Sequence, residues 1–468
     1  MSRTIEPQPM GQAASFRDPS GFVFTRDGIL YRQVQQTFAD DYDAFIDSGL
    51  YDALTQQELL VAHEEVDVGL AAAPGAYRVL RPERVPFVSY PYEWCPGQLR
   101  DAALLTLRIQ ETALDHGMSL RDASAYNVQF RAGRPVFIDT LSFEPLREGQ
   151  PWVAYRQFCR HFLAPLALTT LVDVRLGRLL RSEIDGIPLD LASELLPWRT
   201  RLRPGLLTHL HLHARAETRY EDRPDRGQEA RTSGRFTERA FRGLVESLRG
   251  AVERLAWDAP RTTWSDYYAV AGHYSEAAMA HKEELVAAVL DEARPATVWD
   301  LGANTGRFAE LAAARGATVV AVDADVGAIE AAWRRVREQR SPILPLVVDL
   351  TNPSPGLGWE HTERDSLTAR APADLVLALA LVHHLAIGNN VPLPRFARFL
   401  ASLGRQAVVE FVPKSDPMVE RLLAARDDIF PDYTPEGFER ALDGVFDVVR
   451  RTEVRDTDRI LYVLERSS

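Results

Sequence analysis

The segment VWDLGANTGRFAEL, residues 298–311, joins a short apolar run to an acid and two glycines that are separated by three residues. Val298 and Trp299 are typical of a buried strand, whereas residues 307–314 have the pattern of a helix. A tight turn between a strand and a helix leaves unpaired backbone N–H groups at the helix start, and glycine lets the chain approach a ligand closely. The segment therefore predicts an α/β domain that binds a nucleotide-type ligand.

The glycine loop differs from the dinucleotide-binding fingerprint. It runs Gly302-Ala-Asn304-Thr-Gly306 and lacks the middle glycine of G-x-G-x-x-G. Asp300 adds a carboxylate that would repel a pyrophosphate but suits a ligand with an ammonium and a sulfonium group. S-adenosylmethionine (SAM) has both groups, so we expect these four residues to bind it. In the alternative interpretation, Asp300 caps the helix.

Two further predicted strands end in acids. The stretch GATVVAVDAD, residues 316–325, leads to Asp323 about 20 residues after the glycine loop, where a carboxylate accepts hydrogen bonds from ribose hydroxyls. The stretch PILPLVVDLTNP, residues 342–353, leads to Asp349, which we expect to receive the adenine amino group, with Leu350 against the ring. A carboxylate in the position of Asp323 is compatible with NAD and with SAM, because both contain a ribose.

A fourth predicted buried strand, ADLVLALALVHHL at residues 373–385, contains Leu379 and ends in His383 and His384. In open α/β sheets ligands bind at the carboxyl ends of the strands. A histidine there has a near-neutral pKa and is suited to take a proton from an acceptor. Two alternatives stay open: the histidines are structural, or positioning alone suffices for methyl transfer.

In the order and spacing of these motifs, residues 261–468 resemble the class I SAM-dependent methyltransferases. The resemblance implies a Rossmann-like sheet of seven strands that ends in an antiparallel pair, which matches RQAVVEFVP at 405–413, VFDVVRRTEV at 445–454 and RILYVLER at 459–466. It implies SAM as the cofactor, with Leu379 among its contacts. The region is also similar to a little-characterised bacterial group that includes nodulation-type methyltransferases. This similarity does not identify the substrate. The alternative is an NAD-binding or ligand-free Rossmann-like domain.

Two segments flank the predicted cofactor site. Residues 264–290 predict a lead helix with an aromatic prelude, in which Tyr274 and Lys282 are eight residues apart and share a face over the cofactor. Residues 410–442 form a long insertion of the kind that commonly lies over a substrate mouth. Its candidates for substrate contact are Glu410, Lys414, Asp416, Arg426 and Tyr433.

The first half of the chain has a different pattern, at residues 104–144. A helix ends near His116, and Asp122 and Asn127 precede a hairpin that turns at Ala132 and Gly133 and leads to Asp139. This pattern resembles the catalytic loop of protein kinases and aminoglycoside phosphotransferases. The resemblance implies that Asp122 is the catalytic base and that Asn127 and Asp139 are magnesium ligands in a possible nucleotide site. Alternatively, Asp122 and Asn127 cap turns in an unrelated α+β domain.

The sequence also departs from the kinase pattern. Residues 1–281 contain no lysine and no glycine-rich phosphate loop. Arg32 and Arg78 are candidate replacements, although arginine and lysine are not interchangeable at such sites. Residues 76–82 and 86–94 are expected as lobe and hinge strands. We therefore interpret this half as an α+β domain with a kinase-like fold that has lost or altered phosphotransfer.

Length and composition limit the remaining possibilities. With 468 residues, the chain is long enough for two domains. We expect a flexible N-terminus at 1–20, an α+β domain at 21–212, a charged linker and helix at 213–260, and the methyltransferase domain at 261–468.

The net charge of −12 argues against a nucleic-acid partner, and two cysteines are too few for a zinc cluster, so we expect no metal. No signal peptide or membrane span is evident, which predicts a cytoplasmic protein without a membrane partner.

Two functions are compatible with the sequence. In the first, the chain is a SAM-dependent methyltransferase whose N-terminal domain recruits or orients a small-molecule or peptide substrate. In the second, the N-terminal domain binds Mg-ATP and transfers phosphate, so that the chain is bifunctional or its second half senses SAM.

Overall fold

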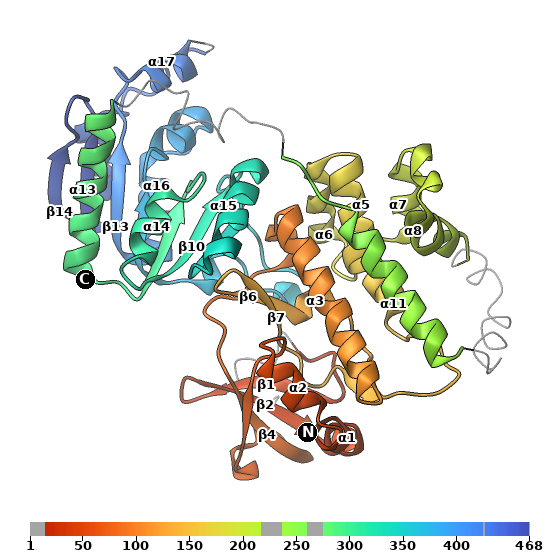
Figure 1. Ribbon diagram of the computed structural model, residues 1–468. Coiled ribbons are helices and arrows are strands. Elements are labelled where there is room, and N and C mark those ends of the chain that lie inside the picture. Colours follow the sequence, from red (N-terminus) through yellow and green to blue (C-terminus); the bar gives the residue numbers. More distant parts are fainter. Residues whose placement is uncertain (1–14, 217–235, 260–274, 425, 468) are drawn as a thin grey trace, which may run out of the picture. The chain divides into compact units, whose positions relative to one another are not determined.

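The computed structural model describes residues 15–216, 236–259, 275–424 and 426–467. The chain divides into two compact units, which are Met1–Asp258 with Gly356–Arg364, and Ala259–Pro355 with Asp365–Ser468 (Figure 1). Among the described helices, none has the length and apolar character that crossing a membrane requires.

The second unit is built on a seven-stranded sheet in the order β11-β10-β9-β12-β13-β15-β14. The strands are β9 (Thr297–Leu301), β10 (Thr318–Asp323), β11 (Ile343–Val347), β12 (Ala373–Ala378), β13 (Gly404–Phe411), β14 (Phe446–Glu453) and β15 (Ile460–Arg466). The first five pair in parallel, whereas β15 runs antiparallel to both of its neighbours. This arrangement confirms the predicted sheet with its antiparallel pair.

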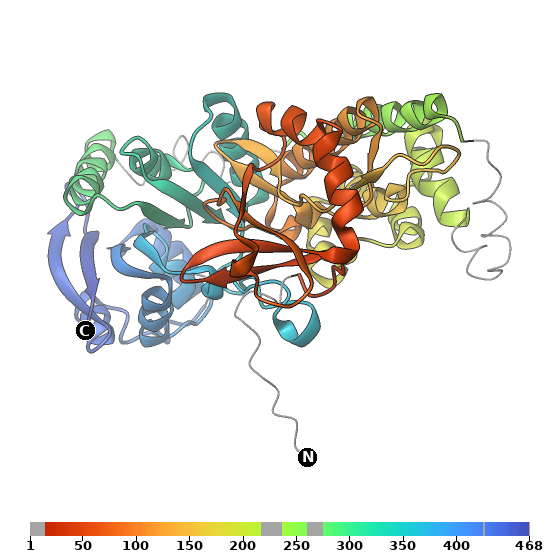
Figure 2. The same ribbon diagram turned by 90° about the horizontal axis from the view of Figure 1, so that it is seen from below.

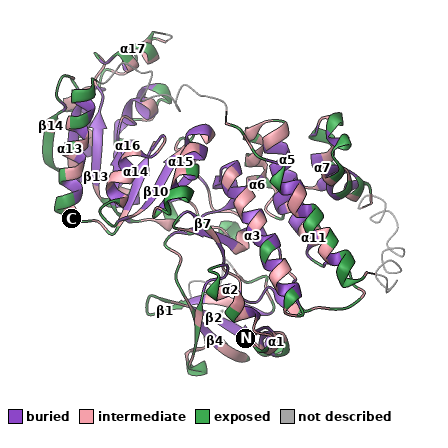
Figure 3. Cartoon of the chain, viewed as in Figure 1, coloured by how far each residue is buried: buried purple, intermediate pink, exposed green. Residues whose placement is uncertain are grey.

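Helices cover both faces of this sheet (Figure 2). They are α13 (Glu276–Ala293), α14 (Arg307–Ala313), α15 (Val326–Gln339), α16 (Leu393–Leu403), α17 (Pro417–Leu423), α18 (Pro435–Leu442) and the short η12 (His384–Gly388). Because a parallel sheet is covered on both faces, its inner strands are mostly apolar. Figure 3 shows these strands as buried. Asp325 is the N-cap residue of α15, and its side chain accepts a hydrogen bond from the Ala328 N–H at 3.0 Å.

Two strand boundaries differ from the sequence prediction. The third predicted strand ends at Val347, two residues before Asp349. The fourth ends at Ala378, so neither histidine lies at the strand end: His383 immediately precedes η12 and His384 is its first residue. Apolar residues that line a binding loop continue the hydrophobic pattern of a strand, which explains the overlong prediction.

The first unit begins with an antiparallel sheet in the order β1-β2-β4-β3. Its elements are β1 (Gly21–Arg26), β2 (Ile29–Gln35), α1 (Ala39–Asp47), α2 (Leu50–Gln56), β3 (His63–Val66) and β4 (Ala76–Pro82). Both helices lie between β2 and β3 in the sequence. β4 occupies the predicted lobe strand at 76–82.

The prediction of a hinge strand at residues 86–94 is wrong. This segment contains the short helix η4 (Pro91–Glu93), because the Glu93 side chain accepts a hydrogen bond from the Tyr90 N–H at 3.0 Å and Pro91 begins the turn.

The kinase-like sequence pattern folds around the long helix α3 (Pro96–Asp115). It is followed by β5 (Met118–Leu120), which pairs with β8 (Phe143–Pro145), and by the hairpin of β6 (Val128–Arg131) and β7 (Arg134–Phe137). The hairpin turns at Ala132 and Gly133, both with positive φ, as the sequence predicted.

Helices make up most of the remaining first unit. They are η3 (Val68–Leu70), α4 (Tyr155–Phe158), η6 (Cys159–Leu163), α5 (Ala164–Leu171), η7 (Val174–Arg178), α6 (Leu179–Ser182), α7 (Leu189–Leu195), η8 (Trp198–Leu202), α8 (Pro204–Leu206), η9 (Leu207–Leu212) and α11 (Glu238–Glu253). Helix α11 packs along α3 (Figure 1), where Arg249 pairs with Glu111. Most of the predicted charged linker, residues 217–235, lies outside the described residues.

The first unit also includes residues 356–364, which follow β11 of the other unit in the sequence. The Glu363 carboxylate pairs with Arg17 at 2.7 Å, and the Arg364 guanidinium carbon lies 4.2 Å from the centre of the Tyr126 ring. At the N-terminal end, Asp18 pairs with Arg32 at 3.4 Å. The last residues of the predicted flexible N-terminus are therefore fixed by side-chain contacts.

Candidate functional site

The second unit has a pocket of about 480 Å³ at the carboxyl ends of β9, β10, β11 and β12. The volume is in the usual range for small-molecule sites. The predicted cofactor residues that line it are Asp300, Gly302, Asn304, Asp323, Asp349, Leu350 and Leu379. Gly306 is not among the lining residues and instead begins α14 with φ of 90°. The sequence therefore located this pocket, although it missed Thr351, Leu381, Leu385 and Asn389 on its wall.

The glycine loop forms one wall of the pocket. Gly302 has φ of 72°, and a Cβ atom there would lie 3.3 Å from Leu381 Cδ1, so a side chain would be both strained and crowded. The backbone N–H groups of Gly302 and Ala303 donate to the Val322 carbonyl oxygen at 2.9 and 3.0 Å, which anchors the loop to β10. Asn304 continues the turn with φ of 52°. At Gly302 the backbone thus approaches the pocket without an intervening side chain.

One buried carboxylate, Asp300, and one half-buried carboxylate, Asp323, border this loop. Asp300 is 2% exposed, and its Oδ2 has no hydrogen-bond partner among the described residues. Burial raises the pKa of Asp300 to about 7, although nearby Lys282 opposes the rise. Asp323 Oδ2 accepts a hydrogen bond from the Asn304 N–H and Oδ1 one from the Asp325 N–H, both at 2.8 Å. Because a carboxylate has about four lone-pair sites, Asp323 can still accept ribose hydroxyls.

Asp349 and Leu350 follow β11 on the pocket wall. Asp349 Oδ1 accepts hydrogen bonds from the N–H and the hydroxyl group of Thr351 at 2.9 and 2.6 Å. This turn fixes the orientation of the carboxylate at the rim. An amino group can therefore approach its other oxygen, as the sequence predicted for adenine.

The two predicted catalytic histidines have different positions. His384 lines the pocket, whereas His383 is 1% exposed and is not among the lining residues. Their rings lie 4.1 Å apart, centre to centre. Burial lowers the pKa of both, so each imidazole is neutral at neutral pH. Only His384 is placed to receive a proton from a molecule in the pocket.

A network of buried charges lies behind this pocket wall. Lys282 Nζ is 2.6 Å from Glu410 Oε2, and Arg459 contacts Glu410 at 3.4 Å and Asp416 at 2.7 Å. Lys282 also lines the pocket, 4.7 Å from the Phe308 ring centre. Sequence reasoning missed Arg459; its only sequence signal was a charged residue at the start of the apolar final strand. Buried charges need such partners because an unpaired one is strongly destabilising.

The other predicted substrate contacts have protein partners. Glu410 is engaged in the buried network and does not line the pocket. Lys414 pairs with Asp428 at 2.7 Å, and the Tyr433 hydroxyl donates to the Val412 carbonyl oxygen at 2.9 Å. These contacts favour structural roles, and substrate contact stays a prediction. Tyr274 lies outside the described residues.

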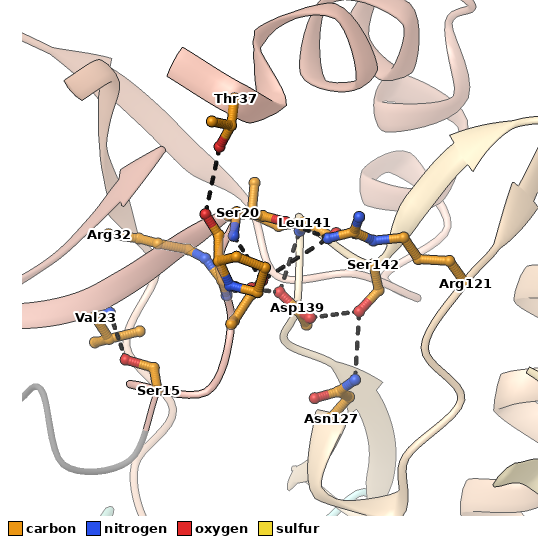
Figure 4. A network of polar contacts seen from close by, with 12 residues as sticks. Ser15, Ser20, Val23, Arg32, Thr37, Arg121, Asn127, Asp139, Leu141 and Ser142 are labelled. Carbon is orange, nitrogen blue, oxygen red and sulfur yellow. Dashed lines mark hydrogen bonds and ion pairs between the residues drawn. The ribbon is translucent and has the colours of Figure 1, made fainter. Parts of the chain in front are cut away.

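The first unit brings its three predicted nucleotide-site residues together. Asn127 Nδ2 donates to the Ser142 hydroxyl at 3.3 Å, and that hydroxyl donates to Asp139 (Figure 4). Burial raises the pKa of Asp122, the charge of Asp139 adds to the rise, and a hydrogen bond from Asn127 opposes it.

The guanidinium group of Arg32 pairs with an aspartate of this cluster. Arg32 on β2 contacts Asp139 Oδ1 at 2.6 Å, and the Leu141 N–H donates to the same oxygen at 3.1 Å. Arg78 is instead paired with Glu65 at 3.0 Å. Across the described ranges, no group of three or more histidine, cysteine, aspartate or glutamate side chains is placed to hold a metal ion.

One curated relative is similar to this protein over nearly the whole chain. No protein-family profile matches. The chain is 35% identical over 464 residues to the nodulation protein NoeA of Rhizobium meliloti (strain 1021), which covers 98% of this chain and 97% of the relative.

Three similar solved structures each match less than half of the chain. The N-methyltransferase NodS from Bradyrhizobium japonicum WM9 matches with 13% identity and a TM-score of 0.32, over 42% of this chain and 99% of its own. Magnesium protoporphyrin IX methyltransferase (ChlM) from Synechocystis PCC 6803 with bound SAM matches with 17% identity and a TM-score of 0.31, over 45% and 100%. The bifunctional kinase-methyltransferase WbdD matches with 18% identity and a TM-score of 0.28, over 40% of this chain and 38% of its own.

The strand order, the glycine loop and the acids at the ends of β9 and β10 agree with the predicted class of domain. The second unit therefore has the fold and the pocket expected of a SAM-dependent methyltransferase domain, a class whose cofactor is SAM. The residues present fit that cofactor, since the pocket offers carboxylates for its ammonium and ribose groups and apolar side chains for its adenine ring.

Proposed function

The chain belongs to the NoeA family, and we propose that it transfers the methyl group of SAM to an acceptor that enters the pocket beside His384. The pocket itself carries this proposal, because the glycine loop, Asp300 and Asp323 line one part of it and His384 lines another. A cofactor site and a neutral proton acceptor thus share one cavity.

The chain's residues have separate tasks in this proposal. Asp300 pairs with the ammonium group and Asp323 holds the ribose, while Leu379, Leu381 and Leu385 reduce the access of water. Bound SAM supplies a methyl group on a sulfonium, which is intrinsically reactive. Positioning the acceptor in line with that carbon–sulfur bond is therefore the main contribution of the protein.

The proton balance assigns a task to His384. The acceptor's lone pair forms the new bond to carbon as the carbon–sulfur bond breaks, and the acceptor then loses a proton. His384 is neutral at neutral pH and can accept that proton from an oxygen, nitrogen or carbon acceptor. His383 packs against it and acts as a positioning residue.

For the first unit we propose recruitment or orientation of the substrate without phosphotransfer. Kinases use a lysine to pair the nucleotide phosphates and an aspartate to hold magnesium. Here the corresponding aspartate, Asp139, is neutralised by Arg32 at 2.6 Å. A magnesium ion would have to displace that arginine, so we expect weak or absent binding of Mg-ATP.

A second candidate function, phosphotransfer in the first unit, is favoured by one observation: Asp122, Asn127 and Asp139 lie in one cluster. A Mg-dependent loss of ATP γ-phosphate that disappears in Asp122→Ala would support it. The chain would then be a bifunctional kinase and methyltransferase.

The acceptor can be identified with methyl-labelled SAM and an extract of the native host. The intact chain should release S-adenosylhomocysteine and label one class of product, and Asp323→Ala should label much less. Labelling that is equal in both proteins would contradict the proposed site.

A further inference from the structure

An exposed basic and apolar surface lies in the first unit between α7 and α8 (Figure 1). Leu195, Trp198 and Leu202 are 42%, 73% and 71% exposed. Arg199, Arg201 and Arg203 lie between and beside them in the sequence and are exposed. Residues 195–205 contain no acid, although the chain as a whole has a net charge of −12.

The local helix explains why apolar and basic groups share this surface. Residues Trp198–Leu202 form the 3-10 helix η8, in which residues three apart lie on the same edge. One edge carries the buried Thr200, which is 1% exposed. The two other edges carry Trp198 with Arg201 and Arg199 with Leu202. Each outward edge thus combines one large apolar side chain with one guanidinium.

The surface is held in place from beneath. The Thr200 hydroxyl donates to the Pro197 carbonyl oxygen at 2.6 Å and contacts His211 Nε2 at 2.9 Å. The other ring nitrogen of His211 contacts the Ser193 hydroxyl on α7 at 2.8 Å. A buried imidazole therefore connects η8 to α7, so the exposed side chains project from a fixed backbone.

We propose that η8 with Leu195 and Arg203 is a docking surface for an anionic lipid bilayer. Tryptophan and leucine enter the boundary between headgroups and acyl chains, while arginines pair with lipid phosphates. The side chains project outward, which suits insertion into a flat interface. Because the net charge of the chain is unfavourable for anionic surfaces, attraction has to come from this local cluster.

Binding of the full-length chain to vesicles tests the proposal. Vesicles of phosphatidylcholine with about one third phosphatidylglycerol should sediment the chain, whereas pure phosphatidylcholine should not, and added salt should weaken binding. The double variant Trp198→Ala, Leu202→Ala should lower the affinity by about tenfold or more. Since each arginine near a charged membrane contributes about fivefold, the variant with Arg199, Arg201 and Arg203 changed to Gln should lose about 100-fold.

Trp359→Ala is the matched control. Trp359 is 62% exposed in the same unit, but the residues that follow it include the acids Glu360 and Glu363 in place of arginines. Its replacement should leave vesicle binding unchanged, and all variants should keep the wild-type thermal transition. The proposal is overturned if the wild-type chain does not bind anionic vesicles. It is also overturned if Trp359→Ala weakens vesicle binding as much as the η8 variants do. Binding to polyglutamate but not to vesicles would also overturn it and would indicate an acidic protein partner.

Discussion

Replacing Asp300 by asparagine should stabilise the chain and weaken SAM binding at the same time. The carboxyl group is 2% exposed, and burial raises its pKa from 3.8 to about 7. The unfolded chain releases this proton near pH 4, whereas the folded chain keeps it until about pH 7. The folded state therefore binds more protons in this window, and the stability that Asp300 contributes at low pH is lost as the pH rises to about 7.

The size of the effect follows from the pKa rise. Since a tenfold change in an ionisation constant corresponds to about 1.4 kcal/mol, the rise costs the folded chain about 4 kcal/mol at pH 8. Between about pH 5 and pH 8, the Asp300 contribution changes by about 2 to 3 kcal/mol. Asparagine cannot ionise, so Asp300→Asn should lack this part of the pH dependence.

Denaturant unfolding of both proteins at the two pH values provides the measurement. Asp325→Asn is the control, because Asp325 lines the same pocket and an asparagine can still cap α15. Calorimetry at pH 8 should show SAM binding weakened by about tenfold or more in Asp300→Asn, since the ammonium group loses its carboxylate. Identical pH dependence of wild type and Asp300→Asn, or unchanged SAM affinity, would refute the reasoning.

Three further predictions concern catalysis, the first unit and the insertion. His384→Ala should reduce turnover about 100-fold and leave SAM affinity nearly intact, as steady-state kinetics and calorimetry would detect; full activity would mean that positioning alone suffices. Calorimetry with Mg-ATP should detect weak or no binding to the wild type, and Asp139→Asn should leave methyl transfer unchanged; tight binding that Arg32→Ala does not strengthen would contradict the role assigned to Arg32. Tyr433→Phe should cost about 1 kcal/mol of stability and spare methyl transfer, because its hydroxyl donates to a backbone carbonyl oxygen; a selective rise in the KM of the acceptor would show substrate contact instead.

Local sequence patterns were sufficient to predict most of the residues that line the pocket of the second unit. The glycine loop and the acid Asp323 lie within about 25 residues of each other, and parallel strands bring their carboxyl ends to one edge. The hairpin turn at Ala132 and Gly133 was predictable for a similar reason, because turn geometry depends on a few adjacent residues. Sequence reasoning is strong where chemistry and backbone conformation are encoded together.

Contacts between distant residues were not predictable. Glu410 resembled a substrate contact in the sequence, but Lys282 and Arg459, which are far from it in the chain, make it part of a buried network. Residues 356–364 belong to the first unit through ion pairs such as that of Arg17 with Glu363. No local sequence pattern predicts a pair between residues so far apart in the chain. Which of the two histidines lines the pocket depends on the residue at which η12 begins. The apolar residues around His383 and His384 give no sequence signal for that position.

Titration of the intact chain and of Asp323→Ala with SAM tests the central claim most directly. Asp323 already accepts two backbone hydrogen bonds and has lone pairs left for ribose hydroxyls. Calorimetry should find one SAM molecule bound per wild-type chain and an affinity about 10- to 100-fold lower in Asp323→Ala, because two hydrogen bonds to a charged acceptor are lost. No SAM binding by the wild type, or equal affinity in both proteins, would contradict the assignment of this pocket.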